Sequence, residues 1–169
     1  YRPPNPGLHR PPSSLNEAMA AVDSSDDGPF WRRKRLEELS PAEWDALCDG
    51  CAKCCLHKLE DIDTGELAFT NVTCRLLDLD SCRCTDYHRR STLMPDCVVL
   101  SPDNIAKLFW MPSTCAYRLL AEGKDLPDWH PLISGDPDSV HRAGISVRGR
   151  AINERWAGPL EHHVLDHEP

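Results

Sequence analysis

Apolar positions in the middle of the chain follow a helical spacing and are preceded by clear helix-start signals. The segment Ser40–Glu43 is a capping box with proline at the first helical position, and the turn signal Asp49–Gly50 follows it. Ser101–Pro102 repeats this start before an apolar stripe that Pro112 interrupts. The pattern therefore predicts one helix that begins at Pro41 and ends at the Asp49–Gly50 turn signal, and a second between residues 101 and 112.

Two shorter helices are predicted further along the chain. Ser113 is expected to cap the third, which runs through Leu120 and closes at Gly123. A fourth is expected to begin at Asp136–Pro137 and to end at Gly144.

Strand-like alternation of apolar and polar residues occurs in two places. Leu67–Thr73 and Ile145–Arg150 both alternate, and we expect them to pair as a small ribbon beside the helices. The stretch Cys74–Cys97 has little periodicity and many charges, so it is predicted to be an irregular loop. A polar loop of this kind needs something to fold around.

Composition divides the chain into three parts. Residues 1–28 are rich in Pro, Ser and Asp and are predicted to be a mostly disordered extension. Residues 29–153 are predicted to form the folded domain. Residues 154–169, with several histidines beside acidic residues, are predicted to be a solvated tail.

The apolar core looks too small to organise the middle of the chain by itself. Leu, Ile, Val and Phe make up about a fifth of the 169 residues, close to the level at which burial no longer offsets chain entropy. Cysteine is the abundant alternative. The nine cysteines are Cys48, Cys51, Cys54, Cys55, Cys74, Cys82, Cys84, Cys97 and Cys115.

The densest part of this stretch is Cys48–Cys55, where three cysteines are spaced three residues apart and a fourth follows directly. Two thiolates in such a tight turn can bind one metal at bond lengths of about 2.3 Å. The repeated spacing is also the first part of the bacterial ferredoxin run for a 4Fe–4S cluster. The Cys-Pro that completes that run is absent, so the fourth ligand must come from elsewhere, for instance Cys97 or Cys115.

Successive side chains diverge, so the Cys54–Cys55 pair is expected to serve two centres or two atoms of one cluster. The second member of the pair would complete a four-sulfur site with Cys74, Cys82 and Cys84. Cys115 falls in the first turn of the third predicted helix, where the helix dipole lowers a thiol pKa. It is therefore predicted to be a ligand or a reactive thiol, with a small buried apolar cysteine as the alternative.

Three explanations for the cysteines compete. Disulfide frameworks are typical of short secreted chains with an even number of cysteines, unlike this one. Structural zinc takes sites of four thiolates, and an iron–sulfur cluster fits the triple spacing better. One or two 4Fe–4S clusters are favoured, with zinc as the close alternative. The predicted fold is a small, irregular, mainly helical α+β domain organised around a cysteine-ligated metal centre, with a short β ribbon.

Residues outside the cysteines give little sign of catalysis. The sequence has no glycine-rich phosphate motif and no hydrolase motif. His57 and His88 lie near cysteines along the chain, and they are interpreted as ordinary histidines because cysteine already supplies enough ligands. Whether the protein is an enzyme stays open, with a non-catalytic role favoured.

Net charge and hydropathy limit the partners. A formal charge of −8 disfavours binding to nucleic acid or to an anionic membrane surface. No apolar run approaches the ~20 residues of a bilayer-spanning helix. We therefore expect a cytoplasmic protein whose partners are metal ions, with any protein partner unknown.

Several motifs together resemble the YcgN family of bacterial cysteine-cluster proteins. The resemblance runs from about Phe30 to Arg150. Its segments are Leu47–Cys51, Cys54–Leu59, Phe69–Val72, Pro95–Cys97, Thr114–Pro127 and Trp129–Leu132.

This family belongs to a wider CxxCxxCC group, described as zinc- or iron-chelating. The group's pattern maps onto Cys48, Cys51, Cys54, Cys55, Cys84, Tyr87 and Cys97. The resemblance implies metal binding in a bacterial cytoplasm and no established reaction. Two other functions stay open: an iron–sulfur enzyme or electron carrier, and a zinc-stapled protein-interaction module without catalysis.

Overall fold

The computed structural model describes residues 28–169. The predicted disordered extension lies outside this part except for its last residue. The helices are α2 (Phe30–Arg33), α3 (Pro41–Ala46), α4 (Arg90–Leu93), α5 (Ala116–Ala121), α6 (Pro131–Ser134), α7 (Ser139–Arg142) and α8 (Glu154–Ala157). The strands are β1 (Leu56–Glu60), β2 (Leu67–Thr73), β3 (Leu77–Asp78), β4 (Arg83–Cys84) and β5 (Ile152–Asn153). Short 3-10 turns cover Leu36–Glu38, Lys53–Cys55, Tyr87–Arg89, Ile105–Lys107 and Leu160–His163.

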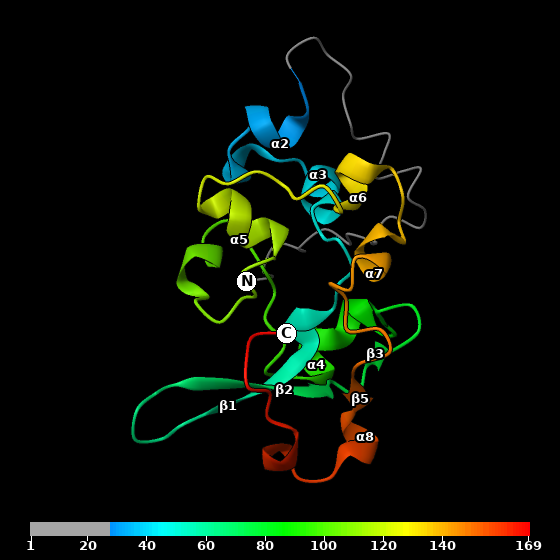
Figure 1. Cartoon of the computed structure of the whole chain (residues 1–169). Coiled ribbons are helices and arrows are strands. Elements are labelled where there is room, and N and C mark those ends of the chain that lie inside the picture. The colour runs from blue at the N-terminus through cyan, green and yellow to red at the C-terminus, as the bar shows by residue number, and fades with distance from the viewer. Residues whose placement is uncertain (1–27) are drawn as a thin grey trace, which may run out of the picture.

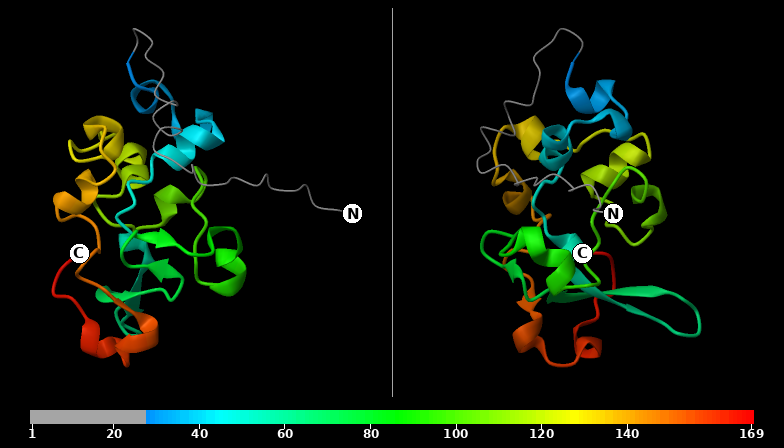
Figure 2. Two further views of the ribbon diagram at one scale, coloured as in Figure 1. Left: turned by 90° about the vertical axis from the view of Figure 1, so that its right-hand side faces the viewer. Right: turned by 180° about the vertical axis from the view of Figure 1, so that it is seen from behind.

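Most helices and the strands lie at opposite ends of the molecule (Figure 1). Helices α2, α3, α5, α6 and α7 form the upper half of that view, and the strands with α4 and α8 form the lower half. The segment between α3 and β1 crosses from one half to the other. Figure 2 shows the same division from two further sides, with the β1–β2 hairpin projecting from the body.

Strand β2 is the centre of a three-stranded sheet in the order β1-β2-β5. β1 pairs with it in antiparallel register, with Leu56 opposite Thr73 and a bulge before Lys58. β5 pairs in parallel with the C-terminal end of β2, and β3 and β4 form a separate two-stranded sheet. The predicted strand Leu67–Thr73 is confirmed as β2.

The predicted strand at Ile145–Arg150 is wrong. These residues form turns, in which Val147 N donates to Cys51 O over 2.9 Å and Gly149 takes a φ of +73°. Val147 is buried in a small apolar cluster, which explains the alternation without a strand partner. The strand that pairs with β2 follows at Ile152–Asn153.

The capping box at the first predicted helix is confirmed. Ser40 Oγ accepts from Glu43 N over 3.2 Å, and Glu43 Oε2 accepts from Ser40 N over 2.7 Å. The helix ends at Ala46, before the predicted Asp49–Gly50 turn.

The helix predicted between Ser101 and Pro112 is reduced to the 3-10 turn Ile105–Lys107. The Asn104 side chain accepts from Ser101 N and donates to Val99 O, both over 2.9 Å. These local hydrogen bonds give the backbone an alternative to the helix, so the apolar residues lie in and after a 3-10 turn instead.

The third helix begins later than predicted. Its N-cap is Cys115, not Ser113, because Ser113 N donates to Glu168 and Thr114 Oγ1 accepts from Lys53. Its predicted closure at Gly123, with a φ of +72°, is confirmed.

The fourth predicted helix is present as α7. It lies between the predicted limits Asp136 and Gly144. Helix α6, which His130 caps through its ring nitrogen, was not predicted.

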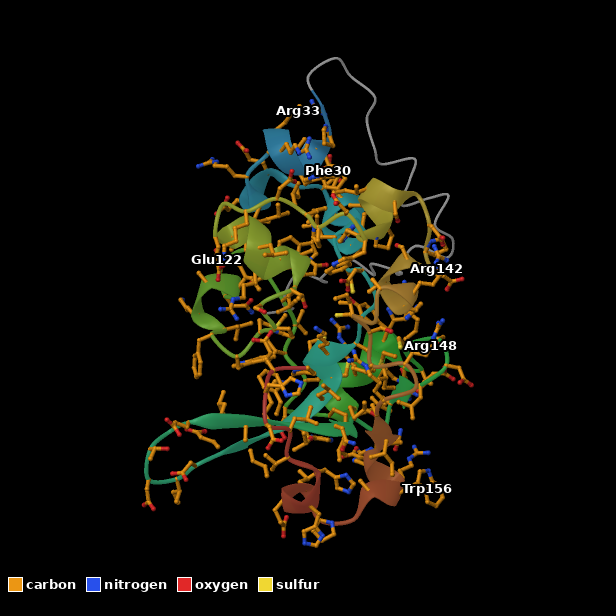
Figure 3. The ribbon with its side chains drawn as sticks, in the orientation of Figure 1. Phe30, Arg33, Glu122, Arg142, Arg148 and Trp156 are labelled. Carbon is orange, nitrogen blue, oxygen red and sulfur yellow. The ribbon has the colours of Figure 1, made fainter. Side chains whose placement is uncertain are left out.

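Two apolar clusters lie on either side of the chain crossing. The larger one joins the helices and consists of Phe30, Trp31, Ala46, Leu47, Ile105, Met111, Ala116, Tyr117 and Leu126. The smaller one lies by the strands and consists of Ala52, Leu56, Leu77, Cys82 and Val147. Figure 3 shows Phe30 in the helical end and Trp156 at the opposite end, on α8. The architecture is thus a small mixed fold of short helices and few strands.

The segment predicted to be a solvated tail lies against β2. Thr70 forms an isolated antiparallel bridge with Val164, and Leu165 N donates to Phe69 O over 2.8 Å. His163 Nδ1 lies 3.0 Å from Asn71 Oδ1. The boundary at residue 153 stays a prediction. None of the helices within residues 28–169 combines the length and apolar character needed to span a membrane.

Phe30 gives a test of the larger cluster. Its side chain is fully buried, edge-on to Trp31 at 5.2 Å. Phe30→Ala should lower the free energy of unfolding by about 3–5 kcal/mol, because it leaves a cavity in the core. Urea unfolding measures this. The control is Phe109→Ala, at a side chain that is 73% exposed, which should cost less than about 0.5 kcal/mol; equal losses would contradict the assignment of the core.

Candidate metal centre

The cysteine loop, residues 47–55, is anchored to both halves of the molecule. At its start, Leu47 O accepts a hydrogen bond of 3.0 Å from His130 Nε2, in the helical half. At its centre, Cys51 O accepts from Val147 N in the smaller cluster. Between these anchors the backbone turns sharply at Gly50, where φ is +77°, and at Ala52, where φ is +60°. The loop therefore has a defined path that does not depend on its cysteine side chains.

Four thiols form what we call the first cysteine group. Its members are Cys48, Cys51, Cys54 and Cys115. Cys51 is buried, Cys115 is half-buried, and Cys48 and Cys54 are exposed. Desolvation by the surrounding protein is the main cause that raises the pKa of Cys48 to about 11, and the charges of Asp49 and of a Cys54 thiolate add to it. Burial, and then the charges of Asp49 and the Cys54 thiolate, likewise raise the pKa of Cys51. Such effects fall off with distance, so these sulfurs are neighbours.

Cys115 joins this group from the start of α5. Burial raises the pKa of its thiol to about 12, and the charges of Cys54 and Cys48 contribute. The expectation that the helix dipole lowers this pKa is therefore wrong, because burial outweighs the short helix. Cys115 is half-buried, and its role as a ligand stays a prediction.

The remaining thiols near the loop form the second cysteine group. Its members are Cys55, Cys74, Cys84 and Cys97. Burial raises the pKa of Cys97, to which the charges of Cys54, Cys74 and Cys84 add. Burial also raises that of Cys74, with a further contribution from Cys84. The backbone helps to fix this group, because Cys74 N donates to Cys55 O over 3.0 Å.

The two groups meet at the Cys54–Cys55 pair. The Cys55 thiol donates to Cys54, which lowers the pKa of Cys54 to about 7 and raises that of Cys55. Lys58 lies beside this pair, and its Nζ donates to Leu56 O over 2.8 Å. Burial lowers the pKa of Lys58, whereas the charges of both thiolates favour its ammonium. The pair thus lies at the junction, as the divergence of neighbouring side chains suggests.

Cys82 belongs to the smaller apolar cluster. Its side chain is 4% exposed and packs with Leu77 and Val147, and Cys55 packs against the same cluster. Burial raises its pKa, and the other groups that act on it are Arg148 and Ser146 rather than cysteines. Figure 3 shows Arg148 between α7 and β3, on this side of the molecule. We therefore assign Cys82 to neither cysteine group, and its expected place in a four-sulfur site with Cys55, Cys74 and Cys84 stays a prediction.

The groups are neighbourhoods of donors, not formed coordination shells. All nine cysteines are free thiols. Over residues 28–169, no three Cys, His, Asp or Glu side chains are arranged to share one metal ion. The chemistry of the donors nevertheless fits zinc and iron–sulfur clusters, since both take sets of four thiolates.

Three charged residues of the loop region were missed by sequence reasoning. Asp49 is buried between two cysteines, and its Oδ1 accepts from Cys51 N over 2.9 Å. Lys53 is only 3% exposed, and its Nζ donates to Thr114 Oγ1 over 3.1 Å. Lys58 lies beside the junction. The one available signal was a lysine between closely spaced cysteines, where thiolates could supply the counter-charge that a buried lysine needs.

The histidines near the loop have other partners. His57 Nε2 lies 2.8 Å from Glu154 Oε2, without a well-directed hydrogen bond. Glu154 also accepts from Arg75 N and adds to the raised pKa of Cys74, so His57 stands next to the second cysteine group. His88 packs its ring edge-on to Tyr87 at 6.2 Å.

Known proteins share both the cysteine segment and most of the chain. Residues 47–116 match the CxxCxxCC family model, described as a "putative zinc- or iron-chelating domain". A UPF0260 protein of Rhizorhabdus wittichii is 61% identical over 84% of this chain and 97% of its own length. A UPF0260 protein of Granulibacter bethesdensis is 62% identical over 81% and 82%, respectively.

The chain belongs to the UPF0260 family. This confirms the family-level resemblance inferred from the cysteine motifs. The domain match supports metal binding in this UPF0260 protein and leaves the choice between zinc and iron open. No solved structure matches the chain.

His130 gives a test of the loop anchor. Its Nδ1 accepts from Leu132 N over 3.1 Å, so the neutral ring must donate from Nε2 to Leu47 O. Burial lowers the pKa of His130 below its usual value, so the unfolded chain takes up the proton first. Stability supplied by this histidine is present above about pH 6.5 and is lost as the pH falls below it.

We expect urea unfolding from about pH 7.5 to about pH 5.5 to show this loss in the wild type. His130→Gln, which can still donate and accept, should give a shallower pH dependence. An unchanged slope would contradict the role given to His130.

Proposed function

We propose that this protein binds metal in the cytoplasm, with thiolates of the first and second cysteine groups each holding one iron–sulfur centre. The observation that carries the proposal is the division of eight of the nine cysteines into two neighbourhoods that meet at Cys54–Cys55. The match to a chelating domain supports it. The free state of all nine thiols agrees with a reducing compartment.

Charge explains why metal is needed. Burial and mutual repulsion raise the pKa of most of these thiols, so ionising several of them in one place is unfavourable without a compensating cation. A bound metal supplies that charge, and it also stabilises the fold because ligation and folding share their free energy. The proposal thus accounts for a cysteine-rich middle region beside two small apolar clusters.

An iron–sulfur cluster would supply one-electron transfer, at a potential set by hydrogen bonds to sulfur and by burial. The chain offers both kinds of control. Leu76 N donates to Cys74 Sγ over 3.4 Å, and Lys58 places its ammonium by Cys54 and Cys55. Zinc at the same two groups is the second candidate, because four thiolates suit a structural zinc site equally well; it would make the protein a stapled module without redox chemistry.

Cys84 and Cys82 form a matched pair for testing the ligands. They are two residues apart, but only Cys84 belongs to a cysteine group. Cys84→Ser should remove roughly half of the metal from anaerobically purified protein, because one of two centres loses a ligand. Cys82→Ser should retain the wild-type content. Iron, sulfide and zinc are measured per chain.

Cys55→Ser should remove the same half as Cys84→Ser, and Cys48→Ser the other half. Metal loss in Cys82→Ser equal to that in Cys84→Ser would contradict the grouping. Wild-type protein without stoichiometric metal would contradict the proposed function itself.

Removal of the metal should also lower stability. Treatment with a strong chelator under anaerobic conditions is expected to lower the thermal midpoint by well over about 5 °C, since binding free energy is lost from the folded state alone. Circular dichroism during heating measures the shift. Re-addition of the metal identified by elemental analysis serves as the control and should restore the midpoint. A thermal midpoint that changes neither on chelation nor on re-addition would show that bound metal does not stabilise the fold.

A further inference from the structure

Asp49 is the least explained group in the cysteine loop. Its side chain is only 6% exposed. One carboxylate oxygen, Oδ1, accepts from Cys51 N over 2.9 Å. The other, Oδ2, is buried without a hydrogen-bond partner. Buried carboxylate oxygens are almost always satisfied, so this atom needs an explanation.

No protein cation forms an ion pair with this carboxylate in the part of the chain that the structure describes, although the charge of Asp49 acts on Lys53. None of the ion pairs there involves Asp49. Two cations of the loop region are engaged elsewhere. Lys53 Nζ donates to Thr114 Oγ1, and the Arg83 guanidinium lies where a Cβ on Gly50 would point. A buried charge without a counter-charge is costly, and proteins keep one where it pairs with a cation or coordinates a metal.

The surroundings of Asp49 add further negative charge. After burial, its carboxylate is the largest single cause that raises the pKa of Cys48 and of Cys51, and it also acts on Cys54. Three potential thiolates and one carboxylate are therefore neighbours, and the cations that act on them, Lys53, Lys58 and Arg83, form no ion pair with Asp49. Asp49 and Cys51 are buried, whereas Cys48 and Cys54 are exposed. Thiolates and a carboxylate are the kinds of donor that zinc and iron take in proteins.

We propose that Asp49 Oδ2 is an oxygen ligand of the centre held by Cys48, Cys51 and Cys54. This rests on the proposed function, because it concerns the same centre. It makes that centre a mixed site of three sulfurs and one oxygen, which suits zinc or a cluster iron better than a metal that demands sulfur alone. The second cysteine group keeps four sulfurs, so the two centres differ in kind. Cys115, at the edge of the first group, is the competing fourth ligand.

Asp49→Asn isolates the proposed ligand atom. The amide oxygen can still accept from Cys51 N, and only the atom without a partner changes, from a charged oxygen to a neutral amide nitrogen. The probe is Co²⁺ alone, added anaerobically to metal-free full-length protein and followed by its thiolate absorption in competition with a chelator. Asp63→Asn, at an exposed position in the β1–β2 loop, is the matched control.

We expect Asp49→Asn to weaken cobalt binding at one centre by about tenfold or more, as loss of a ligand should. The metal-free variant should unfold at the same or a higher temperature than metal-free wild type, because a buried unpaired charge has been removed. Opposite effects on binding and on metal-free stability separate a ligand from a merely structural residue. Asp63→Asn should match the wild type in both measurements.

Unchanged cobalt binding in Asp49→Asn would overturn the proposal. So would weaker binding accompanied by an equally large loss of metal-free stability, or a tenfold loss found in Cys115→Ser and not in Asp49→Asn. Wild-type protein that shows no cobalt–thiolate absorption would instead contradict the proposed function.

Discussion

The cost of ionising several neighbouring thiols is the constraint on which the rest of the structure depends. The loop after α3 brings three cysteines and an aspartate together, and a fourth cysteine follows at the junction with the second group. Lys53 and Lys58 supply some positive charge, but they face sulfurs as well as their own hydrogen-bond acceptors. The chain itself therefore does not balance this charge, which is the physical reason for a metal-bound form.

The scaffold positions this loop from two sides. The larger apolar cluster fixes Leu47 and, through His130, the start of the loop. The smaller cluster fixes its centre through Val147, and β2 carries Cys74 to the loop at the end of the strand. Neither cluster is large, and cysteines border both: Cys115 packs against the larger cluster and Cys55 against the smaller one. The cysteine loop, where potential thiolates lie closest along the chain, is thus the segment that joins the two halves of the molecule.

Local signals were predictable where they are complete within a few residues. The Ser40 capping box, the Gly123 closure and strand β2 could all be read from the sequence. Prediction failed where a distant or side-chain partner decides the outcome. Asn104 replaces a helix by a turn, Glu168 and Lys53 occupy the expected cap at residues 113–114, and Val147 is buried without a strand. For the site, spacing indicated the Cys48–Cys55 loop, whereas the place of Cys82 in the smaller cluster and the burial of Asp49 depend on tertiary packing.

The contact between Lys58 and Trp110 has a practical consequence. The Lys58 ammonium lies 4.6 Å from the centre of the Trp110 ring and 5.3 Å from that of Phe69, while it also serves the Cys54–Cys55 junction. Indole emission responds to nearby charge, so a change in the state of the junction thiols is passed to an aromatic ring through a single side chain. The molecule thus carries an intrinsic fluorophore beside its cysteines, so metal uptake at the proposed centres should be visible in its own emission, without an attached dye.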